Sequence, residues 1–208
     1  MKAGDLCPII VIGSSTGGPQ ILEEIFSGVV RVPAAIIVVQ HLSPSFVPLL
    51  GAHIHQRCGA PVVIPSEGDS IHTGTVYLAP GGRHLLLRNN RVFRFSDAEK
   101  LHGVRPSIDI TMGSIHPGTG NLLMGILLTG MGEDGATGID HIRKLGGVTI
   151  VQDPVTCAIR SMPLAAIATG SVEYILPPGA IASMINKFGQ DGTQSSQLST
   201  ETPAREKK

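Results

Sequence analysis

The sequence contains no tryptophan and few other aromatic residues, with two tyrosines and five phenylalanines among 208 residues. Sixteen Lys and Arg residues balance sixteen Asp and Glu residues, and no basic block is interleaved with aromatic side chains. Proteins that bind nucleic acids combine a basic surface with aromatic side chains that stack on bases. We therefore expect no nucleic-acid partner.

Long hydrophobic runs are also missing. The two longest, residues 34–39 and 122–128, are much shorter than the roughly 20 apolar residues that a membrane-spanning helix needs. Residues 1–5 lack the cationic and then apolar order of a signal peptide. These features predict a cytoplasmic protein without direct membrane insertion.

Cysteine is scarce, and its three copies are widely spaced without a CxxC pair. This pattern predicts free thiols in a reducing compartment. Cys157 lies in a loop-like stretch and could be catalytic, but a small buried hydrophobic residue is the commoner role of a cysteine. His53 and His55 are two residues apart on a predicted helix and should point in different directions, so we expect no metal site there and no cofactor.

Short runs rich in β-branched residues recur along the chain and alternate with helical patterns. Nearly continuous apolar runs are typical of parallel strands that are covered on both faces. The alternation predicts an α/β fold with a doubly wound, mostly parallel sheet and helices on both faces. The expected strands are residues 9–12, 35–40, 61–64, 75–79, 125–129 and 148–152, and the expected helices are residues 19–27, 46–57, 106–115, 136–145 and 178–188.

Residues 84–96 depart from this alternation. Two strand-like runs flank Asn89 and Asn90, which tolerate the positive φ angles of a tight turn. We expect an antiparallel hairpin at one edge of the sheet. Residues 1–188 are interpreted as a single domain, because residues 189–208 lose hydrophobic periodicity and should form a flexible polar tail.

The stretch "GSSTG", residues 13–17, follows the first expected strand and satisfies the pattern G-x-S-x-G. In hydrolases such a strand-to-helix turn exposes a nucleophilic serine, whereas in dinucleotide folds a similar loop binds a pyrophosphate. A nucleotide site would also need an acidic residue at the end of the next strand. That strand ends instead in His41, which could serve as a general base, so the nucleotide interpretation is weakened but stays open.

A serine nucleophile needs a base, and the base is usually oriented by a carboxylate. Because the carboxyl ends of parallel strands meet at one edge of a sheet, His41 should lie near the two serines of the first loop. A later strand is followed by "TGMGEDGATG", which offers Glu133 and Asp134. An acidic pair at this position could equally cap the helix expected from residue 136.

Six segments together resemble the catalytic domain of the CheB family of chemotaxis protein-glutamate methylesterases. They are "IGSSTGGP" (12–19), "VVQHLSPSF" (38–46), "YLAPGGRHL" (77–85), "RPSIDI" (105–110), "LLTGMGEDGATG" (127–138) and "QDPVTCAIRSMP" (152–163). The resemblance covers roughly residues 8–188 and implies a methylesterase catalytic domain over residues 1–188. It implies hydrolysis of glutamate methyl esters on the cytoplasmic helices of chemoreceptors, with deamidation of receptor glutamine as a related activity.

The same resemblance assigns roles to individual residues. It implies that Ser15 rather than Ser14 is the nucleophile, that His41 is the base, and that Asp134 rather than Glu133 is the orienting carboxylate. Thr16 and Met131 would support the oxyanion, and Arg105 is a candidate substrate contact.

Two features differ from the family pattern. Val104 stands where some members have a histidine, and the receiver domain usual at the N-terminus does not precede the first strand. The sequence is therefore interpreted as a catalytic domain of a longer protein or as a stand-alone esterase. An esterase or amidase for a small metabolite and a non-catalytic nucleotide-binding module remain the alternatives.

Overall fold

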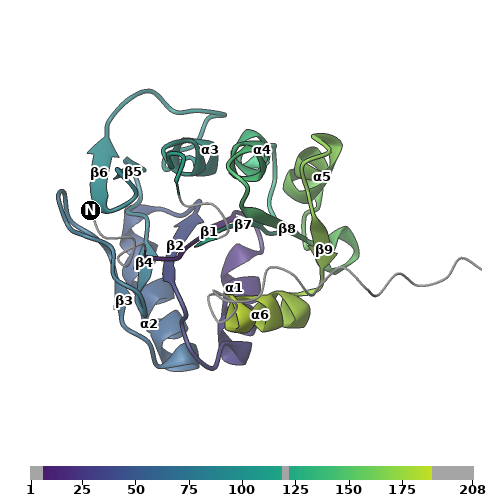
Figure 1. The fold of residues 1–208 in the computed structure, drawn as a ribbon, viewed down its shortest axis with the longest axis horizontal. Helices are drawn as coiled ribbons and strands as arrows, with labels where there is room; N and C mark the ends of the chain where they lie inside the picture. Colours follow the sequence, from purple (N-terminus) through teal and green to yellow (C-terminus); the bar gives the residue numbers. More distant parts are fainter. Residues whose placement is uncertain (1–6, 119–121, 189–208) are drawn as a thin grey trace, which may run out of the picture.

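The computed structural model describes residues 7–118 and 122–188 and contains a seven-stranded sheet covered by helices on both faces (Figure 1). The strand order is β3-β4-β2-β1-β7-β8-β9, and every neighbouring pair is parallel. The strands are β1 (Ile9–Ser14), β2 (Ala35–Gln40), β3 (Val62–Val63), β4 (Val76–Leu78), β7 (Leu123–Leu127), β8 (Val148–Gln152) and β9 (Tyr174–Leu176).

Helices cover the two faces of the sheet in groups of three (Figure 1). On one face lie α1 (Gly18–Gly28), α2 (Val47–Cys58) and α6 (Pro178–Lys187), and on the other lie α3 (Ile108–Gly113), α4 (Ala136–Lys144) and α5 (Ser161–Ala168). Short 3-10 turns, η1 (Pro44–Phe46) and η3 (Pro154–Thr156), follow β2 and β8.

Strand β1 shows why this sheet is buried on both sides. Its side chains alternate between the two faces, so that Ile10 and Ile12 join the core beneath α1, α2 and α6, whereas Ile9 and Val11 join the core beneath α3, α4 and α5. All four residues are fully buried. A strand with apolar residues on both faces must be covered on both faces, as the continuous apolar run predicted.

The direction in which the sheet is built changes at its middle. From β1 the chain proceeds outward to β2, continues to the edge strand β3 and returns to place β4 between β2 and β3; later it proceeds outward in the other direction from β7 through β8 to β9. In sheets of this kind ligands bind beyond the carboxyl ends of the strands where the direction of winding changes. That position lies between β1 and β7.

The predicted hairpin is present as β5 (His84–Arg88) and β6 (Val92–Ser96), joined by Asn89 and Asn90 with φ of 52° and 55°. Its expected position was wrong, because the two strands form a separate two-stranded sheet and not an edge of the main sheet. Leu85 and Phe93 are fully buried in the core beneath α3 and α4, so hydrophobic packing holds the hairpin on the helical layer.

All six predicted strands and five predicted helices are present; two strands have the predicted bounds, and the other elements have shifted ends. Helix α3 begins at Ile108 rather than at residue 106, since Ser107 is its N-cap and accepts a hydrogen bond from the Ile110 N–H. Helix α5 and strand β9 were not predicted. The predicted tail, residues 189–208, lies outside the described residues.

Candidate active site

The ends of β1 and β2 bring Ser15 and His41 side by side. Ser14 is paired with Gln40 in the parallel ladder, and Ser15 and His41 are the next residues on the two strands. The His41 N–H donates to the Ser14 carbonyl at 3.0 Å, and the Ser15 N–H donates to the Thr129 carbonyl beyond β7 at 3.0 Å. Neighbouring strands lie about 4.8 Å apart, so the segments after β1, β2 and β7 converge at one point.

The two adjacent serines have different surroundings. Ser14 is fully buried, and its Oγ donates to Gln40 Oε1 at 2.6 Å. The Gln40 amide in turn donates to the carbonyls of Ser15 and His41 at 2.9 and 3.0 Å. Ser15 is only half-buried, and its hydroxyl makes no hydrogen bond within residues 7–118 and 122–188. Ser14 therefore fixes the loop, and Ser15 has the free hydroxyl.

Close backbone packing around the serines depends on Gly18 and Gly130. A Cβ atom on Gly18 would lie 2.8 Å from Ser14 Cβ and would overlap Gln40 Oε1. A Cβ atom on Gly130 would lie 2.7 Å from Ser15 Cβ and would overlap the sulfur of Met162. Glycine at these positions lets α1 approach Ser14 closely and lets the loop after β7 approach Ser15 closely.

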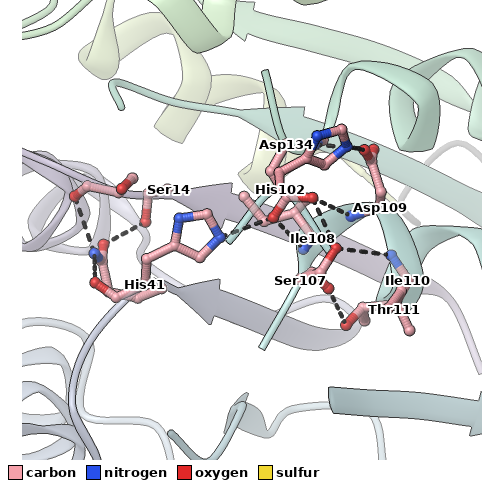
Figure 2. A network of polar contacts seen from close by, with 12 residues as sticks. Ser14, His41, His102, Ser107, Ile108, Asp109, Ile110, Thr111 and Asp134 are labelled. Carbon is pink, nitrogen blue, oxygen red and sulfur yellow. Dashed lines mark hydrogen bonds and ion pairs between the residues drawn. The ribbon is translucent and has the colours of Figure 1, made fainter. Parts of the chain in front are cut away.

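His41 and Asp134 form a short contact beyond the strand ends. His41 Nε2 lies 2.8 Å from Asp134 Oδ2, and the two side chains are 10% and 3% exposed. Figure 2 shows the His41 ring between Ser14 and Asp134. The residues are 93 positions apart in the sequence, and the adjacent positions of β2, β1 and β7 bring them together.

Asp134 is held by four donors in addition to being buried. Oδ1 accepts from Ser107 Oγ at 2.7 Å and from the Asp109 N–H at 3.1 Å. Oδ2 accepts from the Ile108 N–H at 2.7 Å and from His41. Burial alone would raise the pKa of Asp134, but these hydrogen bonds outweigh it, and the pKa lies below its ordinary value. Asp134 is therefore a carboxylate at neutral pH.

An ionised carboxylate can only accept hydrogen bonds, and this fixes the tautomer of His41. The nitrogen that faces Asp134, Nε2, must carry the hydrogen atom. In the neutral ring Nδ1 then holds the lone pair, so it can accept a proton from a nearby hydroxyl. Asp134 also stabilises the positive charge that the ring would gain.

A second histidine, His84, supports Asp134 indirectly through Ser107. The Ser107 N–H donates to His84 Nδ1 at 3.1 Å, which requires a hydrogen atom on Nε2, and that atom faces the Glu99 carbonyl at 3.0 Å. His84 is fully buried and is therefore not a surface residue. The contact links the β5–β6 hairpin through Ser107 to Asp134.

The expected oxyanion residues lie next to Ser15 in the chain and in the neighbouring loop. Thr16 directly follows Ser15, and its carbonyl accepts from Thr129 Oγ1 at 3.0 Å. Met131 is 74% exposed and directly follows Gly130. In the part of the chain that the structure describes, the amides of Thr16 and Met131 donate no hydrogen bond, so both are available to a ligand.

Arg105, the candidate substrate contact, has its guanidinium turned to the preceding loop. One terminal nitrogen, Nη1, donates to the carbonyls of Asp97 and Ala98 at 2.8 and 2.9 Å. Its Nε is buried without a hydrogen-bond partner among the described residues. The observed role of Arg105 is thus to hold the loop that precedes α3.

Two alternative site residues do not join the cluster. The Glu133 side chain is 69% exposed and faces His102, whereas Asp134 is buried and does not cap α4. Cys157 is a half-buried free thiol. Burial, together with the nearby Asp153, raises the pKa of this thiol to about 11, so Cys157 is protonated at neutral pH and is a poor nucleophile.

The sequence interpretation missed the residues that hold the cluster together. Ser107, Ile108 and Asp109 lie within the quoted segment "RPSIDI", and Ser107 with Asp109 two positions later is a recognisable helix start. Gln40 and His84 carried no signal, because their partners are distant in the sequence.

Three possible metal ligands lie close together in the same region. Ligand atoms of His102, Asp109 and Asp134 lie within 4.8 Å of one another. Each oxygen of Asp134 already accepts two hydrogen bonds, so metal binding there would have to displace donors from Asp134.

The described helices include none that is long and apolar enough to cross a membrane.

Comparison with known proteins places these features in a family. Residues 10–185 match the family described as CheB methylesterase. A solved structure with 34% sequence identity, the CheB methylesterase catalytic domain of Thermotoga maritima, superimposes with a TM-score of 0.82. That match covers 88% of this chain and 99% of the solved chain. The seven-stranded parallel sheet is therefore the fold that the sequence predicted.

Curated relatives carry the name protein-glutamate methylesterase/protein-glutamine glutaminase. The relative from Symbiobacterium thermophilum is 36% identical over 192 residues, which are 91% of this chain and 53% of that protein. The relative from Archaeoglobus fulgidus is 38% identical over 191 residues, which are 90% of this chain and 54% of that protein. The chain thus spans about half the length of the curated relatives that it matches.

Proposed function

Because this chain belongs to the CheB methylesterase family, we propose that it hydrolyses methyl esters of glutamate side chains on proteins, with Ser15 as the nucleophile. The observation that carries this proposal is the 2.8 Å contact between His41 and Asp134 at the strand ends beside Ser15. The names of the curated relatives support the same activity.

In the first half of the reaction Ser15 is acylated. As Ser15 Oγ attacks the ester carbonyl, its proton moves to His41 Nδ1, and the charge on the ring is stabilised by Asp134. The carbonyl oxygen becomes an oxyanion, for which the amides of Thr16 and Met131 are the donors. When the tetrahedral intermediate collapses, His41 returns the proton to the leaving methoxide, and methanol departs.

In the second half a water molecule replaces methanol. His41 removes a proton from the water, the resulting hydroxide attacks the acyl carbon, and the proton then passes to Ser15 Oγ as the ester bond breaks. The products are a glutamate side chain and the free enzyme. The same steps with ammonia as the leaving group would convert glutamine to glutamate.

We assign as substrates the cytoplasmic helices of methylated chemoreceptors, and we assign the methylesterase domain to residues 1–188 in the cytoplasm. The free thiols of Cys7, Cys58 and Cys157 are compatible with a reducing compartment. We propose that Arg105 supports this reaction by holding the loop that precedes α3. Direct contact between its side chain and the substrate is a further proposal.

Methanol release from membranes that carry a methylated chemoreceptor tests the proposal. We expect release by the purified chain and much slower turnover of a small methyl ester at equal concentration of ester groups. Equal turnover of both substrates would favour a small-metabolite esterase. No turnover of either substrate by the folded chain would favour a non-catalytic module.

A further inference from the structure

A second buried carboxylate, Asp109, lies beside Asp134 and has no part in the chemistry described above. Its residue is 7% exposed, and Figure 2 shows its side chain next to those of Asp134 and His102. Its Oδ1 accepts from the N–H groups of Gly135 and Gly138 at 2.9 and 2.7 Å. Burying a carboxylate is costly, so these contacts call for an explanation.

The side chain of Asp109 accepts hydrogen bonds from the N-terminus of helix α4. The N-cap residue of α4 is Gly135, which has no side chain to accept a hydrogen bond from the first turn. Helices leave their first N–H groups without partners, and an N-cap side chain normally accepts from the second or third residue of the helix. Asp109 supplies this acceptor from a different helix, since Gly138 is the third residue of α4.

The two glycines at these contacts allow the close approach of α3 and α4. Gly135 has a φ of 100°, which favours glycine, and a Cβ atom there would lie 3.0 Å from Ile108 Cγ2. A Cβ atom on Gly138 would lie 2.8 Å from Met112 Cβ and 3.2 Å from Asp109 Oδ1. The carboxylate of Asp109 therefore fits a space that larger residues at these positions would fill.

Asp109 and Asp134 hold each other in a reciprocal way. The main chain of Asp109 donates to the side chain of Asp134 at 3.1 Å. The side chain of Asp109 accepts from the main chain of Gly135, which directly follows Asp134. Together these bonds close a ring between the first turn of α3 and the loop after β7, and this ring fixes the direction in which Asp134 projects.

We propose that Asp109 is a positioning residue for the esterase reaction: it caps α4 from outside and thereby holds Asp134 in the orientation that His41 requires. This inference rests on the proposed function of Ser15, His41 and Asp134. The role of Asp109 needs an oxygen acceptor and does not need a negative charge, so asparagine can perform it.

The proposed role of Asp109 does not require an ionised side chain, and the groups around Asp109 are consistent with this. His102 Nε2 lies 3.4 Å from Asp109 Oδ2, and His102 Nδ1 lies 3.3 Å from Glu133 Oε1. Burial and the neighbouring charge of Asp134 raise the pKa of Asp109, although the N–H groups of Gly138 and Gly135 act in the opposite direction.

The test compares Asp109→Ala and Asp109→Asn with the matched control Asp140→Ala. Asp140 lies in α4, the helix that Asp109 caps, and its carboxylate contacts Lys144 and Ser171. We expect Asp109→Ala to lower kcat for methanol release by about 10- to 100-fold with KM within about twofold, because small displacements of a catalytic group are costly. Asp109→Asn and Asp140→Ala should stay within about threefold of the parent chain.

A measurement without substrate separates this inference from the proposed function. In Asp109→Ala, amide exchange at Gly135 and Gly138 should accelerate, because their N–H groups lose the acceptor that Asp109 provides. Asp109→Asn should leave the exchange unchanged. This readout stays valid if the parent chain releases no methanol.

Several outcomes would overturn the inference. One is a folded Asp109→Ala variant with unchanged amide exchange at Gly135 and Gly138, and another is an Asp109→Asn variant as impaired as Asp109→Ala. If Asp109→Ala does not fold, Asp109→Leu replaces it, since leucine has a similar shape and no acceptor. A folded Asp109→Leu variant with the parent kcat would contradict the proposal equally.

Discussion

The two halves of the candidate site differ in how firmly they are held. On one side, Ser15 is half-buried, and its hydroxyl has no hydrogen bond within the described residues. On the other side, Asp134 is 2% exposed and accepts four hydrogen bonds from Ser107, Ile108, Asp109 and His41. The His41 ring lies between the unbonded Ser15 hydroxyl and the fully bonded Asp134 carboxylate.

This difference in hydrogen bonding follows from the roles proposed for Ser15 and Asp134 in the reaction. A nucleophile must form and break a covalent bond, so partners on its hydroxyl would have to be lost during each turnover. A carboxylate that stabilises charge acts best when its surroundings are already oriented and need no rearrangement. Substitution of Ser15 should therefore abolish activity with little change in stability, whereas substitution of Asp134 or its donors should disturb the orientation of His41.

The largest effect should come from Ser15→Ala. Loss of the nucleophile should lower kcat for methanol release by at least about 10⁴-fold, as expected for a residue that forms the covalent intermediate. The thermal midpoint should change little, because the Ser15 hydroxyl has no partner to lose among the described residues. Methanol release and circular dichroism measure the two quantities.

Ser14→Ala is the matched control for that variant. It removes the 2.6 Å bond to Gln40 and leaves a buried acceptor without its donor, which should cost about 1–3 kcal/mol of stability. Most of the esterase activity should remain in the folded protein. An exchange of the two results would show that the nucleophile is Ser14.

Asp134→Asn should have the next largest effect, lowering kcat by about 10²- to 10⁴-fold. Every donor around the side chain faces an oxygen, so the amide nitrogen must oppose one of them. If it faces His41, the ring must accept at Nε2 and carries its hydrogen on Nδ1, where the base is needed. Glu133→Gln is the control, and its activity should match the parent chain because its side chain is exposed.

A smaller effect is expected for Ser107→Ala, which removes one of the four donors to Asp134. A hydrogen bond to a charged group contributes about 1.5–3 kcal/mol, so kcat should fall by about 4- to 12-fold if half of that loss is expressed in the transition state. Ser114→Ala is the matched control in the same region, since Ser114 bonds to Leu87 and Thr111. If both variants lost activity equally, Asp134 would not depend on its donors.

The smallest effect concerns stability against pH. The pKa of Asp134 is lowered in the folded protein, so its contribution is present above its unfolded pKa of about 3.9 and is lost as the pH falls through its folded pKa. The pKa of Asp109 is raised, so its contribution is present below the unfolded pKa and is lost as the pH rises through the folded pKa.

Urea unfolding from pH 3 to pH 8 measures this contrast. Relative to the parent chain, Asp134→Asn should be most destabilising at neutral pH and less so near about pH 3, whereas Asp109→Asn should become relatively more favourable as the pH rises. The two pH-dependent differences should have opposite signs, because the pKa of Asp134 is lowered and that of Asp109 is raised. The same pH dependence for both variants would show that the two aspartates share one environment.

Most of the fold could be predicted from the sequence, because the strands are buried on both faces and read as continuous apolar runs. Residues 35–40 and 148–152 have the bounds that were expected. Strand β9 was missed because it is an edge strand of three residues, and its apolar run, Tyr174–Leu176, is too short to mark a strand. Helix α5 was missed because its apolar residues are not confined to one side.

The candidate site was predictable only in part for a similar reason. Ser15 and His41 directly follow buried strands, and that position alone marks them. The choice between Glu133 and Asp134 depended on the family resemblance, because both directly follow the same glycine-containing loop. The role of Asp109 could not be found from the sequence, since its contacts are with the backbone of Gly135 and Gly138, and backbone groups carry no sequence signal.

The close packing around Gly130 limits which substitutions the protein tolerates during evolution. Even a methyl group there would lie 2.7 Å from Ser15 Cβ, so alanine is excluded by size. Gly132, two positions later, has a φ of 98°, and no described atom lies within 4 Å of its missing Cβ. Asparagine tolerates such angles better than most residues. Among surviving variants position 130 should therefore stay glycine, whereas position 132 can change.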